Sequence, residues 1–255
     1  MNFRLNNIPE RTTNPRSYGI TMITDKGLGL QETKNLLSVA APYIDFAKLA
    51  FGTSLFTPLL REKIELYQSQ NIPVYLGGLL LEAFIIRNQF SDYIRFIQDF
   101  GITHIEMSDG SLNISHEEKC GYIEKLTKYG TVLSEVGSKD KDKVLVTPPY
   151  KWIDLMTKEL SAGASYVIAE ARETGTVGLF RDSGEVREGL VQEILVKIPA
   201  EKIIWETPQK DQQLYFIKTI GANVNLGNIA TTDVIALEAM RIGLRSDTFE
   251  LYLDK

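Results

Sequence analysis

The chain has 255 residues, of which 44% are hydrophobic and 24% are charged, and its formal net charge is -5. These proportions are typical of a globular protein with a sizeable core, and the acidic balance argues against a nucleic-acid binder, which usually carries a basic face. The single cysteine, Cys120, excludes an internal disulfide and a cysteine-based zinc site, and it fits a reducing compartment.

The N-terminal residues 1–19 lack the apolar stretch of a signal peptide. No later segment has the uninterrupted run of about 18 apolar residues that a membrane span needs. We therefore expect a cytoplasmic protein that has no nucleic-acid partner and no membrane partner.

Eight short runs of largely apolar residues recur along the chain, and we expect each of them to form a β-strand. The runs show little strict alternation between apolar and polar residues, which is typical of parallel strands covered on both faces. The expected strands are Gly19–Gly27, Tyr43–Gly52, Ile72–Gly78, Ile102–Gly110, Thr131–Lys139, Ser165–Gly175, Lys202–Pro208 and Ala222–Asn228.

Between these runs, apolar residues stand three and four positions apart, as they do on one face of a helix. Two clear examples predict helices over residues 60–71 and 81–100. Thr-Pro pairs indicate helix starts, because the hydroxyl can cap a free N–H and proline has none to satisfy. These pairs are Thr57-Pro58, Thr147-Pro148 and Thr207-Pro208. Glycines that indicate helix ends are Gly101, Gly130, Gly163 and Gly221.

Strand, polar loop, helix and glycine repeat eight times at intervals of roughly 20 to 37 residues, which predicts an α/β fold, a (β/α)8 TIM barrel. We expect a single barrel domain over residues 19–255, preceded by a polar N-terminal arm over residues 1–18. The alternative is a doubly wound open sheet, which usually has fewer strands and a glycine-rich phosphate-binding turn after its first strand. Residues 25–30, DKGLGL, contain only two glycines and match that turn poorly.

Polar side chains stand near the carboxyl ends of these strands, the end of a barrel that carries its chemistry. Alternation along each strand directs a set of them toward the barrel mouth: Asp25, Lys48, Glu106, Glu135, Glu170, Glu206 and Asn225. The third strand offers Gly77 and Gly78, which leave space for a ligand. Any one of these residues alone is more often a solvated or ion-paired side chain. The four glutamates of the set, if close together, are unfavourable unless cations or ligands compensate them.

Part of that compensation is available from Lys48, Lys139 and Arg172, and a divalent metal could supply the rest. Carboxylate and amide ligands suit Mg2+ or Mn2+ rather than zinc. Of the two histidines, His104 stands early on its strand, and we interpret it as a core or supporting residue. His116 follows Ser115, which forms an expected capping box with Glu118, so a structural role is favoured there.

Two further segments concern anions. After the eighth expected strand, the backbone around Gly227 and Asn228, with a helix start near Thr231 and Thr232, could cradle a phosphate or serve as an ordinary helix cap. Residues 173–189 carry Arg181 and Arg187, and they form either a lid that brings a cation to an anionic substrate or an exposed connection.

Several motifs occur in order over nearly the whole chain: NPRSYGITMITDKGLGL, DFAKLAFGTS, HIEMSDGSLNIS, LSEVGSKD, IAEARETGTVGLF and NLGNIA. Together they resemble the phosphosulfolactate synthase family, whose members are also (β/α)8 barrels. The resemblance implies a carbon–sulfur lyase-type enzyme that adds sulfite to phosphoenolpyruvate with the help of Mg2+, giving (2R)-O-phospho-3-sulfolactate. It also implies a place in coenzyme M biosynthesis in some organisms and in sulfolactate supply in others.

The resemblance assigns roles to individual residues. A lysine just after the EVG segment is the proposed proton donor in the family, and Lys139 stands there, although Lys141 and Lys143 follow closely. We expect Glu135 and Lys48 to share in catalysis. The expected ligands of substrate and phosphate are Lys48, Arg172, Gly227 and Asn228. The expected metal ligands, chosen by strand parity, are Glu106, Glu135 and Glu170, with Asp25 and Asp109 as weaker candidates.

Other readings of the same residues stay open. A Schiff-base aldolase would use Lys139 or Lys48 as its amine, and an enolase-like lyase would also form an enolate at a barrel mouth. A non-catalytic barrel subunit is a third reading, although an inert barrel has no need of carboxylates at its rim. Barrels of this kind often associate, so we expect a homo-oligomer.

Overall fold

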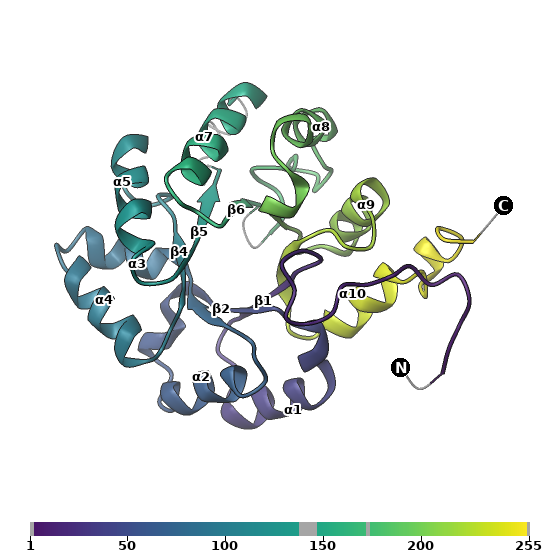
Figure 1. Cartoon of the computed structure of the whole chain (residues 1–255), viewed down its shortest axis with the longest axis horizontal. Helices are drawn as coiled ribbons and strands as arrows, with labels where there is room; N and C mark the ends of the chain where they lie inside the picture. The colour runs from purple at the N-terminus through teal and green to yellow at the C-terminus, as the bar shows by residue number, and fades with distance from the viewer. Residues whose placement is uncertain (1–2, 138–146, 172–173, 254–255) are drawn as a thin grey trace.

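The computed structural model describes residues 3–137, 147–171 and 174–253. Eight parallel strands form one sheet in the order β3-β2-β1-β8-β7-β6-β5-β4, and β3 and β4 come into contact without a hydrogen-bonded ladder (Figure 1). The strands are β1 (Thr21–Asp25), β2 (Phe46–Leu49), β3 (Val74–Leu76), β4 (His104–Met107), β5 (Thr131–Val136), β6 (Tyr166–Ala169), β7 (Ile203–Glu206) and β8 (Leu226–Ala230).

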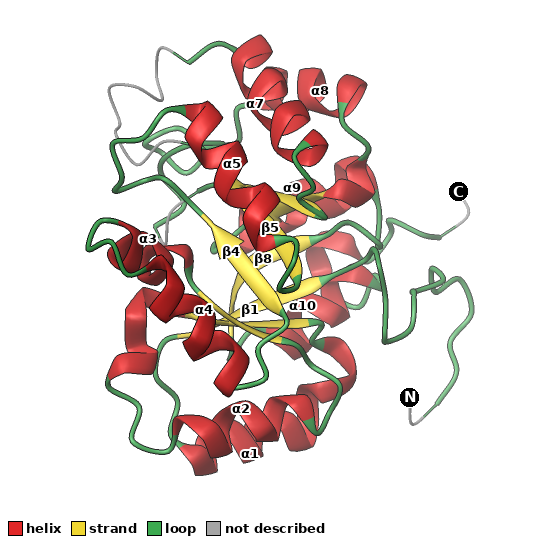
Figure 2. Cartoon of the chain, turned by 60° about the vertical axis from the view of Figure 1, so that its left-hand side comes forward, coloured by secondary structure: helices red, strands yellow, loops and turns green. Residues whose placement is uncertain are grey.

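Helices surround the central strands (Figure 2). The α-helices are α1 (Leu30–Ala40), α2 (Leu60–Gln68), α3 (Gly78–Ile85), α4 (Phe90–Asp99), α5 (His116–Leu126), α7 (Pro149–Ser161), α8 (Glu188–Lys197), α9 (Lys210–Ile220) and α10 (Val234–Arg241). Short 3-10 helices are η1 (Ala41–Tyr43), η2 (Ala50–Leu55), η3 (Ala200–Lys202) and η4 (Ser246–Thr248). The barrel prediction is confirmed. None of the helices in these ranges has the length and apolar character that a membrane crossing demands.

All eight expected strands form, but the last one begins at Leu226 rather than at Ala222. The Asn225 side chain explains the delay, because its amide takes over contacts that a strand backbone would make. Its Oδ1 accepts the N–H of Ile20 at 3.0 Å, and its Nδ2 donates to the carbonyls of Glu201 and Ile203 at 3.0 and 3.1 Å. Asn225 therefore closes the amino-terminal end of the barrel, and its expected place at the mouth is wrong.

The helix starts expected at the Thr-Pro pairs are wrong by one or two residues. The helices α2, α7 and α9 begin at Leu60, Pro149 and Lys210. The hydroxyl of Thr57 donates to the carbonyl of Thr53 at 2.9 Å and so closes the turn before it. At α9 the side chains of Gln209 and Gln212 form the capping box instead. The capping box of Ser115 and Glu118 is confirmed.

The expected helix over residues 81–100 is two helices, α3 and α4. They are separated by a turn in which Asn88 has a φ of 56°, a left-handed conformation that asparagine tolerates. Gly101, Gly163 and Gly221 have positive φ beyond helix ends, as expected. Gly130 serves a different purpose, since a Cβ there would lie 2.2 Å from the carbonyl oxygen of Thr103.

The gap between β3 and β4 is closed by side chains. Glu106 accepts the N–H of Gly78 at 2.6 Å. Glu82, buried on α3, accepts the N–H of Ser111 at 2.6 Å and is also hydrogen-bonded by the hydroxyl of Ser108. A Cβ on Gly78 would lie 2.2 Å from that hydroxyl oxygen, so the glycine makes room for the seam.

A cluster of apolar side chains fills the barrel interior below the mouth, toward the amino-terminal ends of the strands: Ile20, Met22, Phe46, Tyr75, Leu133, Ile168 and Ile204. Because side chains alternate along a strand, the residues two positions later on the same faces reach the mouth. On β1 the inward residues are Met22 and Thr24. Asp25 therefore points outward, where Lys63 and Tyr67 bind its carboxylate at 2.7 and 2.9 Å, and its expected inward direction is wrong.

Candidate active site at the barrel mouth

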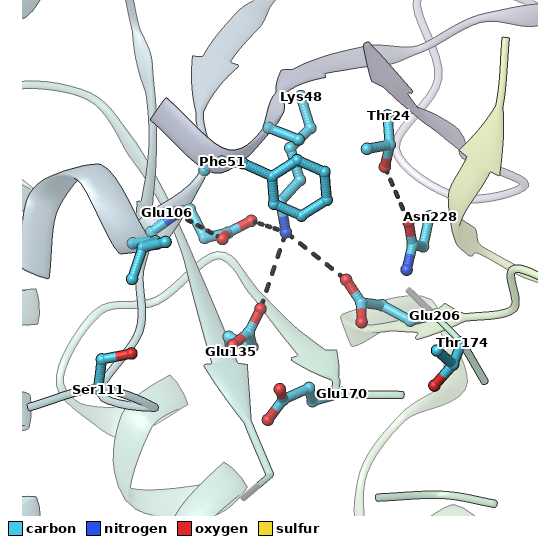
Figure 3. A pocket seen from close by; sticks show the side chains of 14 residues that line it. Thr24, Lys48, Phe51, Glu106, Ser111, Glu135, Glu170, Thr174, Glu206 and Asn228 are labelled. Atoms are coloured by element: carbon cyan, nitrogen blue, oxygen red, sulfur yellow. Dashed lines mark hydrogen bonds and ion pairs between the residues drawn. The ribbon is translucent and has the colours of Figure 1, made fainter. Parts of the chain in front are cut away.

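A cavity of about 400 Å³ opens at the carboxyl ends of the strands (Figure 3). Every strand contributes to its lining either directly or through the loop that follows. The lining residues are Thr24, Lys48, Ala50, Phe51, Gly77, Gly78, Leu79, Glu106, Ser111, Glu135, Glu170, Thr174, Glu206 and Asn228.

Lys48 lies at the centre of this cavity, and three carboxylates converge on its ammonium (Figure 3). The Nζ atom is 2.8 Å from Glu106, 3.6 Å from Glu206 and 3.7 Å from Glu135. Burial on its own would lower the pKa of Lys48, but the charges of Glu106 and Glu206 outweigh it and raise the pKa well above the ordinary value. Lys48 is therefore a fixed cation.

Burial in the cavity also shifts the pKa of the glutamates around Lys48. Burial raises the pKa of Glu206 to about 7, although the Lys48 ammonium acts in the opposite direction. Burial likewise raises the pKa of Glu106, again against the effect of Lys48. Both side chains are anchored by backbone donors, since Glu206 accepts the N–H of Ala171 at 3.1 Å and Glu106 accepts that of Gly78. The cavity thus holds more carboxylate than one ammonium can stabilise.

Glu135 and Glu170 stand at the tips of the neighbouring strands β5 and β6. Gly137, with a φ of 156°, makes room for the Glu170 side chain, because a Cβ on Gly137 would lie 2.6 Å from the Cβ of Glu170. The backbone of Glu135 is held from outside the barrel by Lys119, whose buried Nζ donates to the Glu135 carbonyl at 2.6 Å.

Lys119 is itself held by two carboxylates, Asp109 at 3.1 Å and Glu159 at 3.0 Å. Burial would lower its pKa, but Glu159 and Asp109 reverse the effect and raise it. His116 contacts the same Glu159 at 3.0 Å, which agrees with the structural role expected for it. Asp109, a weaker metal candidate, is thus engaged by Lys119 rather than in the cavity.

Asn228 reaches the cavity through an irregularity of β8. The register between β1 and β8 shifts by one residue, and Asn228 adopts a left-handed φ of 57°. Its Oδ1 accepts the hydroxyl of Thr24 at 3.0 Å. Gly227 lies deeper, since a Cβ there would lie 2.4 Å from Met22 and 2.9 Å from Ile204, and it is not part of the cavity lining.

The structure brings together five of the residues expected at the site: Lys48, Glu106, Glu135, Glu170 and Asn228. Lys139 and Arg172 lie outside the described residues. The start of α10 is less suited to an anion than the sequence indicated, because its N-cap is the carboxylate Asp233. His104 packs against Phe46 with ring centroids 5.2 Å apart, as a core or supporting residue would, and burial lowers its pKa to about 4.

The expected loop over residues 173–189 is well anchored in its described part. Gln209 donates to the carbonyl of Thr174 at 2.6 Å, and Gln212 donates to that of Gly175 at 2.7 Å. Leu179 and Phe180 are buried in the outer core. Residues 175–180 are therefore packed on the barrel, whereas Arg181, Asp182 and Ser183 are exposed.

Glu206 was expected at the mouth but was given no role, and four further lining residues were not expected there: Thr24, Phe51, Ser111 and Thr174. The sequence indicated the inward direction of Glu206, because it stands at the end of a strand on the inward face. Thr24 was hidden by the wrong parity of β1. Phe51, Ser111 and Thr174 lie in loops, where strand alternation gives no direction.

The donor set of the cavity suits a hard cation such as Mg2+, because it consists of carboxylate oxygens. In the described parts of the chain, no group of three or more acidic, histidine or cysteine side chains is arranged to hold a metal. Mg2+ in proteins is usually held by only one or two carboxylates together with water and substrate. The four glutamates beside one lysine fit that mode of binding.

Known proteins of one family match nearly the whole chain. Residues 9–247 match the family model described as (2R)-phospho-3-sulfolactate synthase (ComA). The phosphosulfolactate synthase of Bacillus subtilis is 41% identical over 96% of this chain and 97% of its own length. That of Methanothermobacter thermautotrophicus is 40% identical over 94% of this chain and 95% of its own length.

Solved structures agree on the fold alone. The 3-hexulose-6-phosphate synthase of Salmonella typhimurium superposes with a TM-score of 0.54 at 11% identity, over 92% of this chain and 98% of that one. A phosphonopyruvate hydrolase in complex with oxalate and Mg2+ gives a TM-score of 0.52 at 14% identity, over 85% of this chain and 77% of that one. The near full-length match in sequence decides the assignment: the chain belongs to the phosphosulfolactate synthase family.

Proposed function

We propose that this chain is a phosphosulfolactate synthase that adds sulfite to phosphoenolpyruvate and forms (2R)-O-phospho-3-sulfolactate. The observation that carries the proposal is the fixed ammonium of Lys48 among glutamates at the mouth of a barrel of this family. A buried cation at that position suits a substrate whose phosphate and carboxylate are both anionic.

The reaction places clear demands on the cavity. The sulfur lone pair of sulfite forms a bond to C3, the C2–C3 double bond breaks, and its electron pair moves toward the substrate carboxylate. A proton then adds to C2. Negative charge therefore builds up at the carboxylate end, and fixed positive charge there lowers the barrier.

Lys48 is suited to bind the substrate carboxylate, because its ammonium is held in place by three carboxylates and stays charged. The same raised pKa disfavours the Schiff-base aldolase reading for Lys48, since an amine must be neutral to attack a carbonyl. Asn228, which accepts the hydroxyl of Thr24, is a proposed ligand for the phosphate or for sulfite. Lys139 remains our proposed proton donor and Arg172 a proposed anion ligand, whereas the position of Gly227 below the cavity disfavours the phosphate-binding role expected for it.

The charge in the cavity supports a divalent cation. Among the described lining residues, Lys48 is the only cation and faces four glutamates. Two anionic substrates would be repelled from such a site unless further positive charge is added. We propose that Glu135 and Glu170 hold Mg2+. Glu106, also expected as a ligand, is the less favoured one because it is engaged by Lys48 and Gly78.

When bound, Mg2+ would stabilise the charge that develops on the substrate carboxylate. Its presence would also offset the repulsion among the glutamates. The chain's own residues would do the rest: Lys48 orients the substrate, and Lys139 delivers the proton to C2.

The direct test is to incubate the purified protein with phosphoenolpyruvate, sulfite and Mg2+, follow the loss of enol absorbance, and identify the product by mass spectrometry and 31P NMR. We expect phosphosulfolactate in the complete mixture and none when a chelator is added. A Glu170→Gln variant should need more Mg2+ to reach half-maximal rate, whereas Glu32→Gln, on the surface of α1, should match the wild type. Absence of product across a range of pH and metals would refute the proposal.

A further inference from the structure

One residue of the cavity has a backbone conformation that its side chain does not favour. Phe51, in η2, has φ 56° and ψ 23°, in the left-handed region, and Gly52 follows with φ 70°. Elsewhere in the described chain, the non-glycine residues with positive φ are all asparagines: Asn7, Asn71, Asn88 and Asn228. Asparagine tolerates this region because its short polar side chain can hydrogen-bond locally, whereas phenylalanine has no such compensation.

The conformation of Phe51 is fixed by what surrounds it. Just before it, the carbonyl of Leu49 accepts the N–H of Gly77 at 3.0 Å, and Ala50 is buried. Just after it, the N–H of Phe56 donates to the carbonyl of Thr53 at 2.9 Å. Strain of this kind persists only where neighbouring structure enforces it, and it is concentrated at functional sites.

The hydrophobic core does not account for the ring. Phe51 is 52% exposed, so only part of the ring is removed from water by the fold. Figure 3 shows that ring at the cavity. The side chains of Ala50, Phe51 and Leu79 are the apolar part of a lining that is otherwise polar, charged or glycine.

We propose that Phe51 is a specificity-determining residue whose ring contacts the C3 methylene of the enol phosphate; this inference rests on the proposed function. The methylene is the apolar edge of phosphoenolpyruvate, and every other substituent of the molecule is oxygen-rich and anionic. An aromatic wall beside that edge would favour an unsubstituted C3, leave no space for a 3-methyl group, and keep water from the carbon atoms that react. The strained backbone holds the ring over the cavity instead of over the core.

The experiment compares two enol phosphates, phosphoenolpyruvate and its 3-methyl homologue, with sulfite and Mg2+. The ratio of their kcat/KM values is measured for the wild type, Phe51→Ala and Phe51→Gly. A matched control is Phe56→Ala, because Phe56 lies on the same loop, is 79% exposed and does not line the cavity. We expect both Phe51 variants to lower the preference for phosphoenolpyruvate by about 10-fold or more, the scale of one methyl group in an apolar pocket. Phe56→Ala should leave the ratio unchanged.

The two Phe51 variants also distinguish the effect of losing the ring from the effect of backbone strain. Both lack the ring, but glycine adopts the left-handed conformation without strain, so Phe51→Gly should melt about 2–4 °C above Phe51→Ala, the reverse of the usual order. A wild-type ratio in both variants would overturn the proposal, as would a Phe51→Ala variant that melts above Phe51→Gly. Failure of the proposed function is distinguishable, because the wild type itself would then form no product from phosphoenolpyruvate.

Discussion

The two ends of the barrel use buried charge in opposite ways. At the amino-terminal end, Arg11 binds Glu238 through two hydrogen bonds of 3.0 and 3.1 Å, and Arg16 lies 3.0 Å from Asp45. The fully buried Arg241 donates to the carbonyls of Ala222 and Val224, both at 2.7 Å, and of Ile20 at 3.1 Å.

At the mouth, by contrast, the described lining contains four glutamates and one lysine. At the amino-terminal end, the guanidinium groups are thus paired with carboxylates and carbonyls of the fold itself. Arg11 and Arg16 of the N-terminal arm bind the barrel in this way. Among the described residues, the mouth carries more negative than positive charge, and we expect Lys139, Arg172 and bound ligands to balance it. The difference teaches that the imbalance of buried charge, rather than its amount, distinguishes the candidate active site from a structural network.

The largest expected effect comes from removing the cation of the mouth. Lys48→Met should lower turnover about 10²–10³-fold, because a fixed charge that stabilises the developing anion is lost. It should also lower the unfolding free energy by roughly 3–5 kcal/mol at pH 8, since the glutamates lose their counter-charge. At pH 5 that loss should be smaller, because the carboxylates can protonate. Steady-state kinetics and urea unfolding at both pH values measure these effects.

A surface ion pair provides the control for that experiment. Lys158 lies beside Asp154, and their side chains are 58% and 53% exposed. Lys158→Met should change stability by no more than about 0.5 kcal/mol and leave turnover intact. Equal losses in the two lysine variants would remove the basis for treating the mouth as special.

At the opposite end of the barrel, Arg241→Met should lower the unfolding free energy with little effect on catalysis. The variant leaves buried carbonyl oxygens without their donor, at about 1–3 kcal/mol for each unsatisfied group, so we expect a loss of about 3 kcal/mol. The value of kcat/KM at 25 °C should stay within about threefold of the wild type. A variant that unfolds normally but turns over 100-fold more slowly would contradict the division between the two ends.

Glu206→Gln tests the charge imbalance at the mouth through the pH dependence of the unfolding free energy. The folded-state pKa of Glu206 is raised from 4.5 to about 7, so its contribution to stability is present below pH 4.5 and is lost as the pH rises through 7. Glutamine mimics the protonated carboxyl, so the variant should exceed the wild type in unfolding free energy at pH 8 by up to about 3 kcal/mol. The advantage should vanish toward pH 4.5. Urea unfolding over pH 4.5–8 checks the trend, and a constant difference would count against it.

The smallest effect concerns the support behind β5. Lys119→Met removes the donor to the Glu135 carbonyl and leaves the lining of the cavity unchanged. We expect the Mg2+ requirement for half-maximal rate to rise about 10-fold, the scale seen when a residue that orients a metal ligand is lost. An unchanged metal requirement, in a variant that is merely less stable, would leave Lys119 with a structural role only.

Much of the fold could be predicted from the sequence, because repeated strands, helices and glycines leave a strong local pattern. The direction of Lys48, Glu106, Glu135, Glu170 and Glu206 followed from alternation along their strands. The same rule failed for β1, since both faces of a parallel strand are apolar and nothing fixes which residue is inward. Asp25 and Thr24 were exchanged for that reason.

Other features depend on contacts between distant segments and leave no local pattern. Asn228 lies at the cavity because the register of β8 shifts against β1. Asn225 lies away from the cavity because its side chain bonds to segments on both sides of β8. The left-handed Phe51 is equally hidden, because nothing in the letters around it indicates a conformation that phenylalanine avoids. The positions of these residues are set by tertiary structure: Asn228 and Phe51 lie at the mouth, and Asn225 lies at the opposite end.

The most direct test of the central claim is the melting temperature of the wild type with phosphoenolpyruvate alone, Mg2+ alone and both together. A surplus of negative charge at the mouth predicts a negligible shift with phosphoenolpyruvate alone and an increase of several degrees with both, because a ligand that binds only the folded state stabilises it. Glu170→Gln should reduce the joint increase. An equal increase with phosphoenolpyruvate alone, or none with both, would contradict the account.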